Sequence, residues 1–239
     1  MQNQQELLIA CDEYGNPLPG KDEQGRESSK IERGPAHRFG ITHLALMFTY
    51  KNSENQIYLA KRVARRDDLE SQGIPTPFGG FWDASGAGHY RWSELVGNEL
   101  VDKKARILGE LDEEFGVRVQ GDRIKLVGSF RYSAIDPNYY GSAIQVQESE
   151  VCYLAILYND YEPRLDTKEV SLGQWVGSEA LRKEVEEFMR KHVADSYNGS
   201  VKARKTERSA RLLTPWFLKA QQTFPEEIYE YRTNAAVSR

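Results

Sequence analysis

Apolar positions along the chain gather in its central part, in runs that are typical of buried β-strands. Residues 41–50 (ITHLALMFTY) form such a run, and the polar turn KNSENQ separates it from a second run at 57–63 (IYLAKRV), which predicts a hairpin. Three further strands are predicted later in the chain, at 124–132, 143–158 and 169–176. The centre of the chain is therefore expected to form a β-sheet.

Glycine and proline residues mark two segments with little regular structure. A short strand at 6–12 leads into the turn-rich sequence DEYGNPLPGKDEQGRESS, which predicts an irregular loop. The second segment runs from Gln72 to Gly88, and we expect it to be a loop that passes over a strand edge.

Helical patterns occur at 95–116, where Gly116 is the expected C-cap, and again in the last third of the chain. That last third predicts a helix at 178–193, a break at Asn198-Gly199 and a further helix that contains residues 213–224. A strand-rich centre with one inserted helix, followed by helices, predicts an α+β fold in which helices flank a mixed β-sheet.

The organisation predicted from these patterns is one domain with terminal additions. Residues 1–35 supply an N-terminal strand and loop, and residues 36–177 form the main domain. Residues 178–239 form a C-terminal helical extension that packs on the same domain.

Composition and charge narrow the class of protein. With 239 residues, 39% hydrophobic content and a net charge of -4, the chain is typical of a globular protein and lacks an apolar stretch that could cross a membrane. The mild negative charge argues against a nucleic-acid partner, and the basic run between Lys202 and Arg211 is interpreted as a solvated helix face. Two distant cysteines, Cys11 and Cys152, and the absence of a secretory signal indicate the cytoplasm.

Candidate chemistry lies on the helix predicted at 95–116. At 100° of rotation per residue, the carboxylates of Glu110, Glu113 and Glu114 share an arc of about 100°, next to an apolar stripe that would dock on the sheet. Crowded carboxylates repel one another, whereas Mg²⁺ or Mn²⁺ would turn the repulsion into attraction. The alternative is a glutamate-rich solvated helix, and the spacing alone favours that alternative.

The surrounding sequence resembles the Nudix box, Gly-x5-Glu-x7-Arg-Glu-apolar-x-Glu-Glu-x-Gly-apolar. Gly88-HYRWS-Glu94 matches the first part, and the run from Glu110 to Val117 (ELDEEFGV) matches the second. The resemblance implies a Nudix-type mixed β-sheet with flanking helices, and a metal-dependent hydrolase that cleaves a diphosphate bond.

Two departures from the box concern its middle. Fourteen residues separate Glu94 from position 109, where the family has seven, so an insertion must be housed before or within the helix. The family's arginine is Gly109 here, a poor helix former. Arg106 lies within the acid arc and is the candidate substitute that orients the glutamates, together with Glu94.

A wider resemblance is to isopentenyl-diphosphate isomerase and related Nudix hydrolases. It rests on ELLIACDEYGNPLPG, HRFGITHLALMF, WDASGAGH, FRYSAIDP, ESEVCYLAIL and LTPWF, and it covers roughly residues 6–220. Carried over residue by residue, the metal ligands of that family fall on His43, His89, Glu114, Glu148 and Glu150, while His37 is one residue off the expected spacing. The alternative for His43 is that it is a hydrogen-bonded histidine of the core without a metal. The alternative for Glu148 and Glu150 is that they are exposed residues that only keep the protein in solution.

Ala87 distinguishes between the two reactions that this resemblance implies, isomerisation and hydrolysis. The isomerase uses a cysteine before the Gly-His pair to move a proton, and this chain has Ala87 there, whose methyl group carries no exchangeable proton. The prediction is therefore hydrolysis of a nucleoside diphosphate-linked or other organic diphosphate. An isomerase-like enzyme and a catalytically weak diphosphate-binding domain remain open, as does the oligomeric state, for which a dimer is considered.

Each candidate residue has an expected role in catalysis, metal binding or substrate binding. Glu113, Glu114 and Glu150 are the candidate catalytic residues, and Mg²⁺ or Mn²⁺ is the expected cofactor. The candidate metal ligands are Glu110, Glu113, Glu114, Glu148 and His89. Arg62 and Arg66 are candidates for holding phosphate, with a solvated edge as their alternative, and Trp82 for stacking on substrate, with core packing as its alternative.

Overall fold

A computed structural model of the chain describes residues 6–19, 29–70, 76–97, 99–100, 102–136, 146–192 and 212–230. Several predictions lie wholly or partly outside these residues, among them the basic run between Lys202 and Arg211, the break at Asn198-Gly199, the start of the strand predicted at 143–158, part of the N-terminal turn-rich loop and the start of the loop predicted from Gln72.

The central feature of the structure is a mixed β-sheet. Its main strands lie in the spatial order β11-β4-β3-β10-β9, and β10 runs parallel to β3 while the other pairs are antiparallel. The strands are β3 (His43–Lys51), β4 (Gln56–Arg62), β9 (Ile124–Ile135), β10 (Gln147–Tyr158) and β11 (Val170–Gly177). All five correspond to predicted strands, so the strand-rich centre and the α+β class are confirmed.

The strands β3 and β4 pair only near their connecting turn, at Lys51 and Ile57, and then diverge. Two short strands occupy the fork: β5 (Trp82–Asp83) pairs with β4, and β6 (Gly86–His89) pairs with β3. At the fork Ser85 accepts a hydrogen bond from the Tyr50 amide (2.7 Å) and donates one to the Tyr58 carbonyl (2.8 Å). The predicted loop at 72–88 was therefore wrong for β5 and β6, because diverging strands leave backbone groups that these short strands satisfy, whereas residues 76–81 lack helix and strand as predicted.

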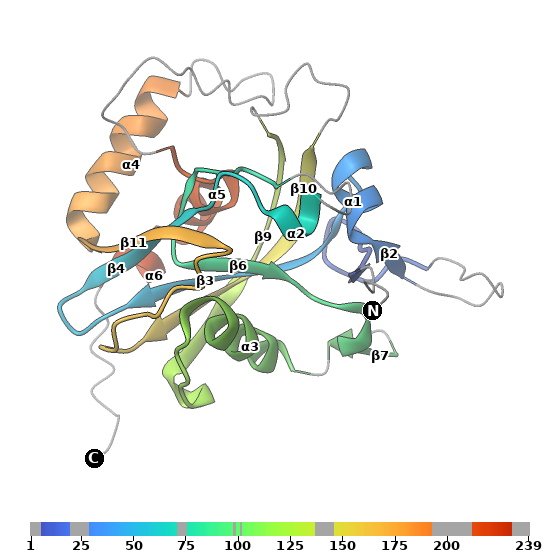
Figure 1. Ribbon diagram of the computed structural model, residues 1–239, viewed down its shortest axis with the longest axis horizontal. Helices are drawn as coiled ribbons and strands as arrows, with labels where there is room; N and C mark the ends of the chain where they lie inside the picture. The colour runs from blue at the N-terminus through green and yellow to red at the C-terminus, as the bar shows by residue number, and fades with distance from the viewer. Residues whose placement is uncertain are drawn as a thin grey trace.

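Helices cover both faces of the sheet (Figure 1). On one face α3 (Lys103–Phe115) packs its apolar residues against Leu44, Leu46 and Phe48 of β3. On the other face, α4 (Ser178–His192), α5 (Pro215–Thr223) and α6 (Pro225–Tyr229) share a core cluster with Ala45 and Met47. Alternate residues of β3 thus serve two cores, which explains why this strand is apolar almost throughout.

The helix α3 begins eight residues later than predicted. Asp102 is its N-cap and accepts hydrogen bonds from the amides of Lys104 (2.9 Å) and Ala105 (3.1 Å), and the left-handed Gly116 ends it as expected. The preceding residues form the 3-10 turn η1 (Trp92–Glu94) and a small hairpin, β7 (Leu95–Val96) and β8 (Glu99–Leu100). The insertion is therefore housed before the helix.

The N-terminal segment contributes a second small sheet, β1 (Leu7–Ile9) with β2 (Lys30–Glu32), and the unpredicted helix α1 (Arg33–Phe39). Gly40, in the left-handed conformation, ends α1. The predicted boundary between residues 35 and 36 falls inside this helix. Two short elements complete the described fold: α2 (Asp67–Glu70) and the 3-10 turn η2 (Gly121–Arg123).

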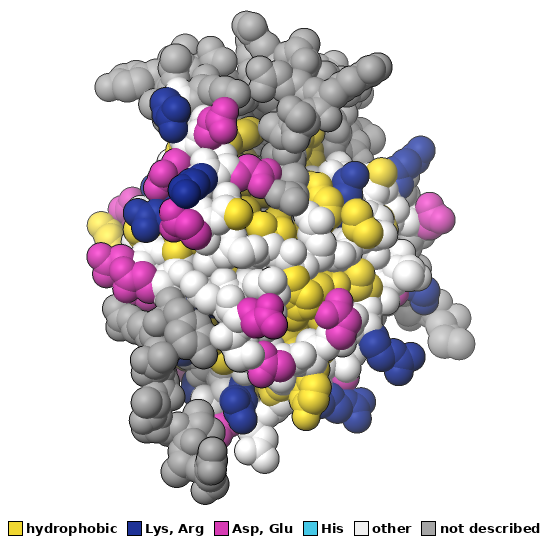
Figure 2. Space-filling model, turned by 90° about the vertical axis from the view of Figure 1, so that its left-hand side faces the viewer, with side chains coloured by type: hydrophobic (Ala, Val, Ile, Leu, Met, Phe, Trp, Pro, Cys, Tyr) yellow, Lys and Arg dark blue, Asp and Glu magenta, His cyan; other side chains and the backbone are white. Residues whose placement is uncertain are grey.

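On the surface of the described residues, positively and negatively charged side chains are mixed (Figure 2). On the face shown in Figure 2, Lys and Arg side chains lie among Asp and Glu side chains, and the described residues there form no extended basic patch. Within the described part of the chain, no helix combines the length and the apolar character that crossing a membrane requires.

Candidate functional site

A cavity of about 570 Å³ opens where β6, α3, β10 and the N-terminal helix α1 meet. Most residues that the sequence singled out line it, namely Arg62, Arg66, His89, Arg106, Glu110, Glu113, Glu114, Glu148 and Glu150. These nine residues come from four separate segments of the chain, namely the end of β4 with the residues after it, β6, α3 and β10.

Three histidines and a glutamate form a buried cluster in the cavity wall. His37 comes from α1, His43 from β3 and His89 from β6, and their ring centroids lie 5.0 to 5.1 Å apart in all three pairs. One ligand atom from each histidine and one from Glu148 lie within 4.8 Å of one another. Despite its spacing in the sequence, His37 therefore lies with the other two histidines, because the turn of α1 directs it inward.

Hydrogen bonds fix the orientation of these side chains. His37 Nδ1 lies 2.8 Å from Glu148 Oε1, and His43 Nδ1 donates to the carbonyl of Ile41 at 2.8 Å. Glu150 Oε1 lies 3.4 Å from His43 Nε2 and 3.3 Å from His89 Nε2. Both Glu148 and Glu150 are buried, so they are not the exposed solubility residues considered above.

The electrostatics of the cluster favour neutral imidazoles at two positions. Burial lowers the pKa of His37 well below its usual value and lowers the pKa of His89 to about 3. Burial raises the pKa of Glu148, whereas His43 and His89 hold the pKa of Glu150 well below its usual value against the effect of burial. A neutral imidazole presents a lone pair, which is the form that binds a metal ion.

Three buried polar atoms of the cluster have no hydrogen-bond partner among the described residues: His37 Nε2, His43 Nε2 and Glu148 Oε2. Buried polar atoms without partners are costly. Imidazole nitrogens and carboxylate oxygens held this close together fit the ligand set of a divalent cation, which would satisfy these atoms.

The acids of α3 approach the cavity over two glycines of β6. A Cβ atom at Gly88 would lie 2.5 Å from Glu110 Oε1, and one at Gly86 would lie 2.8 Å from Glu114 Oε2. A side chain at Gly88 would displace the Glu110 carboxylate, and one at Gly86 would displace the Phe48 ring as well as the Glu114 carboxylate. The requirement for Gly88 in the box-like sequence is therefore a close approach of the helix acids to the strand.

Arg106 lies in the middle of this group of acids. It donates a hydrogen bond to Glu110 and another to the His89 carbonyl (3.2 Å), and it lies 3.8 Å from Glu113. Glu94 lies 3.7 Å from the Arg106 Nε atom. Arg106 thus lies among the acids, as the helical rotation predicts, and Glu94 contacts it without lining the cavity.

The two neighbouring glutamates of α3 differ in environment. The side chain of Glu113 is 57% exposed and faces Arg91 and Arg106 at 3.8 Å. Glu114 is buried, and burial, reinforced by the charge of Glu169, raises its pKa well above the usual value. Glu113 is therefore the more accessible carboxylate, and Glu114 the one that gains most from a nearby positive charge.

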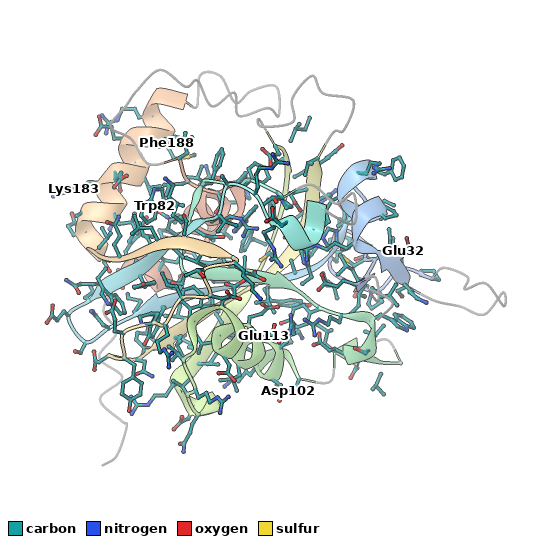
Figure 3. The ribbon with its side chains drawn as sticks, in the orientation of Figure 1. Glu32, Trp82, Asp102, Glu113, Lys183 and Phe188 are labelled. Carbon is teal, nitrogen blue, oxygen red and sulfur yellow. The ribbon has the colours of Figure 1, made fainter. Side chains whose placement is uncertain are left out.

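Arg62 and Arg66 also supply positive charge to the wall of the cavity. Arg62 lies with its Cζ atom 5.4 Å from the centroid of the Trp216 ring, and Arg66 pairs with Glu169 at 2.6 Å. Trp216 lines the cavity, but Trp82 is not among its lining residues. Trp82 packs partly buried against the core on the α4 and α5 side of the sheet, whereas Glu113 lies on α3 (Figure 3). The structure thus puts Trp82 in the core-packing position and Trp216 at the wall.

Several lining residues were not singled out from the sequence. Tyr132 donates a hydrogen bond to Glu150, and Arg33 approaches from α1 and pairs with Glu6 at 2.6 Å. Tyr132 and Trp216 lie in FRYSAIDP and LTPWF, segments that carried the resemblance, so that signal was present. Ala87 also lines the cavity, and a methyl group there offers no proton.

Comparisons with known proteins give partial similarities. No protein-family model and no curated protein matches the chain. Among solved structures it is similar to the protein DR0079 from Deinococcus radiodurans (18% identity, TM-score 0.48, 76% of this chain and 90% of that one). It is also similar to a MutT NUDIX hydrolase from Burkholderia pseudomallei (18% identity, TM-score 0.38, 58% and 84%) and to the MutT protein from Methanosarcina mazei Go1 (12% identity, TM-score 0.45, 79% and 96%). At TM-scores below 0.5, these similarities carry no weight for the function.

Proposed function

We propose that the chain is a metal-dependent hydrolase that cleaves the diphosphate bond of a nucleoside diphosphate-linked or other organic diphosphate. The observation that carries the proposal is that the α3 carboxylates and the guanidinium groups of Arg62 and Arg66 line the same cavity. Carboxylates without a cation would repel a diphosphate, so a cavity lined by both carboxylates and arginines suits a substrate that arrives with metal.

The residues present fit divalent cations at two places. Glu110, Glu113 and Glu114 offer the hard oxygen ligands that Mg²⁺ and Mn²⁺ prefer, and the histidine cluster with Glu148 offers mixed nitrogen and oxygen ligands. Metal bound to such ligands neutralises phosphate charge and lowers the pKa of a bound water.

Among the carboxylates, Glu113 is best placed to accept a proton from the attacking water. It is the most exposed of the three α3 acids, so it can reach a water inside the cavity. Glu114 and Glu150 are the other candidate catalytic residues, but the imidazoles of His43 and His89 already face Glu150. We therefore assign proton transfer to Glu113 and ligation to Glu110, Glu114, Glu148 and His89.

Arg106 and Glu94 are proposed to orient the acids. The guanidinium contacts both Glu110 and Glu113, and Glu94 faces it from η1. The cation that the Nudix box places directly before its first helix glutamate would thus be supplied one turn earlier.

Arg62 and Arg66 are proposed to bind the phosphate groups of the substrate. Both line the cavity, and guanidinium groups match the geometry of phosphate oxygens. The partner is accordingly a small molecule, and a cytoplasmic location remains a prediction that agrees with two free, buried cysteines, Cys11 and Cys152.

A second candidate function is isomerisation of an allylic or homoallylic diphosphate. The cluster of His37, His43 and His89 with Glu148 favours it, because it reproduces the ligand types of the isomerase resemblance. Ala87 argues against it, since the isomerase's cysteine is missing from the wall.

The experiment is a panel of nucleoside diphosphates, nucleoside diphosphate sugars and isopentenyl diphosphate, each with magnesium, manganese or EDTA. We expect metal-dependent release of a phosphate-containing product from at least one member. Isomerisation of isopentenyl diphosphate without hydrolysis would favour the second candidate. Tight binding without turnover would favour a diphosphate-binding domain.

A further inference from the structure

Asp83 is a buried carboxylate that lies behind the cavity wall rather than in it. Its side chain is 2% exposed, on the short strand β5. The Oδ1 atom accepts hydrogen bonds from the Ala84 amide (2.8 Å) and the Thr214 hydroxyl (3.2 Å), and Oδ2 accepts one from the Trp216 indole nitrogen (2.7 Å). Asp83 thus links β5, at the point where β3 and β4 diverge, to the start of α5.

Asp83 also faces Arg62, one of the arginines that line the cavity. Its Oδ2 atom lies 3.9 Å from Arg62 Nη1, and the Arg62 Nε atom donates to the Pro77 carbonyl at 3.2 Å. The Arg62 guanidinium lies over the ring of Trp216, whose indole nitrogen is held by the same carboxylate. Arg62 is therefore oriented by Asp83 twice, directly and through Trp216.

Asp83 lines a small second cavity, with a volume of about 20 Å³, next to the main one. Arg62, Arg66 and Glu114 line both cavities, whereas Asp83 lines only the small one. Arg62 consequently stands between a carboxylate behind it and the open space in front of it.

The energetics of Asp83 set it apart from an ordinary core residue. A carboxylate held away from water is costly, and burial raises the pKa of Asp83 to about 6 despite Arg62 and three hydrogen bonds. For stability alone, well-packed apolar residues often do as well as a buried ion pair. An arginine side chain, by contrast, must lose rotamer entropy before it can hold an anion in a fixed geometry.

We propose that Asp83 is a positioning residue that, together with Trp216, holds the Arg62 guanidinium ready for a diphosphate group. The inference rests on the proposed function in one respect, that the anion in the cavity is a diphosphate. Asp83 itself touches no substrate, and its effect passes through Arg62.

The test uses inorganic pyrophosphate with magnesium as the probe, and calorimetry of binding to the full chain. We expect Asp83→Asn to weaken binding about tenfold, which corresponds to about 1.4 kcal/mol. Trp216→Phe keeps a ring for Arg62 but removes the indole donor, and we expect a smaller loss of affinity. In an Arg62→Ala background, Asp83→Asn should have little further effect, because the residue through which it acts is gone.

Lys51→Met is the control for a loss of stability alone. Lys51 is also fully buried, and it donates to the carbonyls of Ile228 (2.9 Å) and Glu230 (3.0 Å) without lining the cavity. We expect it to lower the melting temperature and to leave pyrophosphate affinity unchanged.

The inference is overturned if Asp83→Asn binds pyrophosphate as the wild type does, or if it weakens binding equally with and without Arg62. Hydrolysis of the substrate panel, measured on the same proteins, separates this result from the proposed function. Weakened pyrophosphate binding without any turnover supports Asp83 and refutes the hydrolase. Normal turnover by the wild type, together with an Asp83→Asn variant whose pyrophosphate affinity is unchanged, supports the hydrolase and refutes the role of Asp83.

Discussion

Arg106 donates a hydrogen bond to Glu110, one helical turn further along α3, and both side chains are buried. The Nudix box has its arginine directly before the first helix glutamate, where this chain has Gly109. The i,i+4 arrangement brings a guanidinium to the same carboxylate from the preceding turn. The geometry thus offers a substitute for the missing cation.

Removing this guanidinium should cost both activity and stability. We expect Arg106→Gln to lower kcat about a hundredfold and to destabilise the protein by about 3 kcal/mol, because Glu110 is left buried without its partner. Arg106→Lys should recover part of the loss, since a cation returns. The measurements are steady-state kinetics and urea unfolding, and a kcat of Arg106→Gln equal to that of the wild type would contradict the assignment.

Gly109 should be replaceable by alanine. A Cβ atom there would meet only Arg106 Nη1, at 3.5 Å, which is an ordinary contact. Because glycine is a poor helix former, Gly109→Ala should stabilise the protein by about 1 kcal/mol with kcat unchanged. Thermal unfolding and kinetics check this, and a destabilised Gly109→Ala would mean that the helix needs glycine for close packing.

Metal binding should raise stability through the histidine cluster. A ligand at about 100 times its Kd stabilises a protein by about 2.7 kcal/mol, so EDTA should lower the melting temperature and added divalent metal should restore it. We expect His43→Gln to lose most of this response, because His43 Nε2 faces the cluster. Glu179→Gln, on the surface of α4, is the control that should respond as the wild type does. A wild-type melting temperature insensitive to EDTA and metal would be evidence against the site.

Asp83 gives a prediction about pH. Its pKa is about 6 in the folded protein against an ordinary 3.8, so the folded state binds this proton more tightly than the unfolded state does. The stability that Asp83 contributes is fully present below pH 3.8, and it is lost as the pH rises through about 6. Asp83→Asn removes the effect, so its stability relative to the wild type should improve as the pH is raised from 4 to 6. Urea unfolding at several pH values measures this, and a difference independent of pH would refute it.

The parts of the fold that the sequence predicted are those with a strong local pattern. β3 is buried on both faces, so it appears in the sequence as a continuous apolar run, and α3 has a stripe set by helical rotation. The same rotation put Arg106 among the acids correctly. These predictions needed no knowledge of distant contacts.

The parts that could not be predicted depend on residues far apart in the chain. β5 and β6 exist because β3 and β4 diverge, and the glycines that allow the acids of α3 to approach β6 look like loop residues in the sequence. Likewise, Trp216 reaches the cavity wall through a hydrogen bond to a residue 133 positions earlier. Local periodicity contains no information about such pairs.

The central claim is that water attacks a diphosphate at the α3 carboxylates. It is tested most directly by turnover of the substrate panel in water enriched in ¹⁸O, with magnesium or manganese. Two variants are compared with the wild type: Glu114→Gln, which keeps the shape of a buried carboxylate, and Asp112→Asn, which alters an acid of the same helix that pairs with the exposed Arg118.

We expect one ¹⁸O atom in one of the two phosphate-containing products of wild type and Asp112→Asn, and a fall in kcat of about a hundredfold or more for Glu114→Gln. Unlabelled product, isomerised isopentenyl diphosphate or a Glu114→Gln variant as active as the wild type would contradict the account.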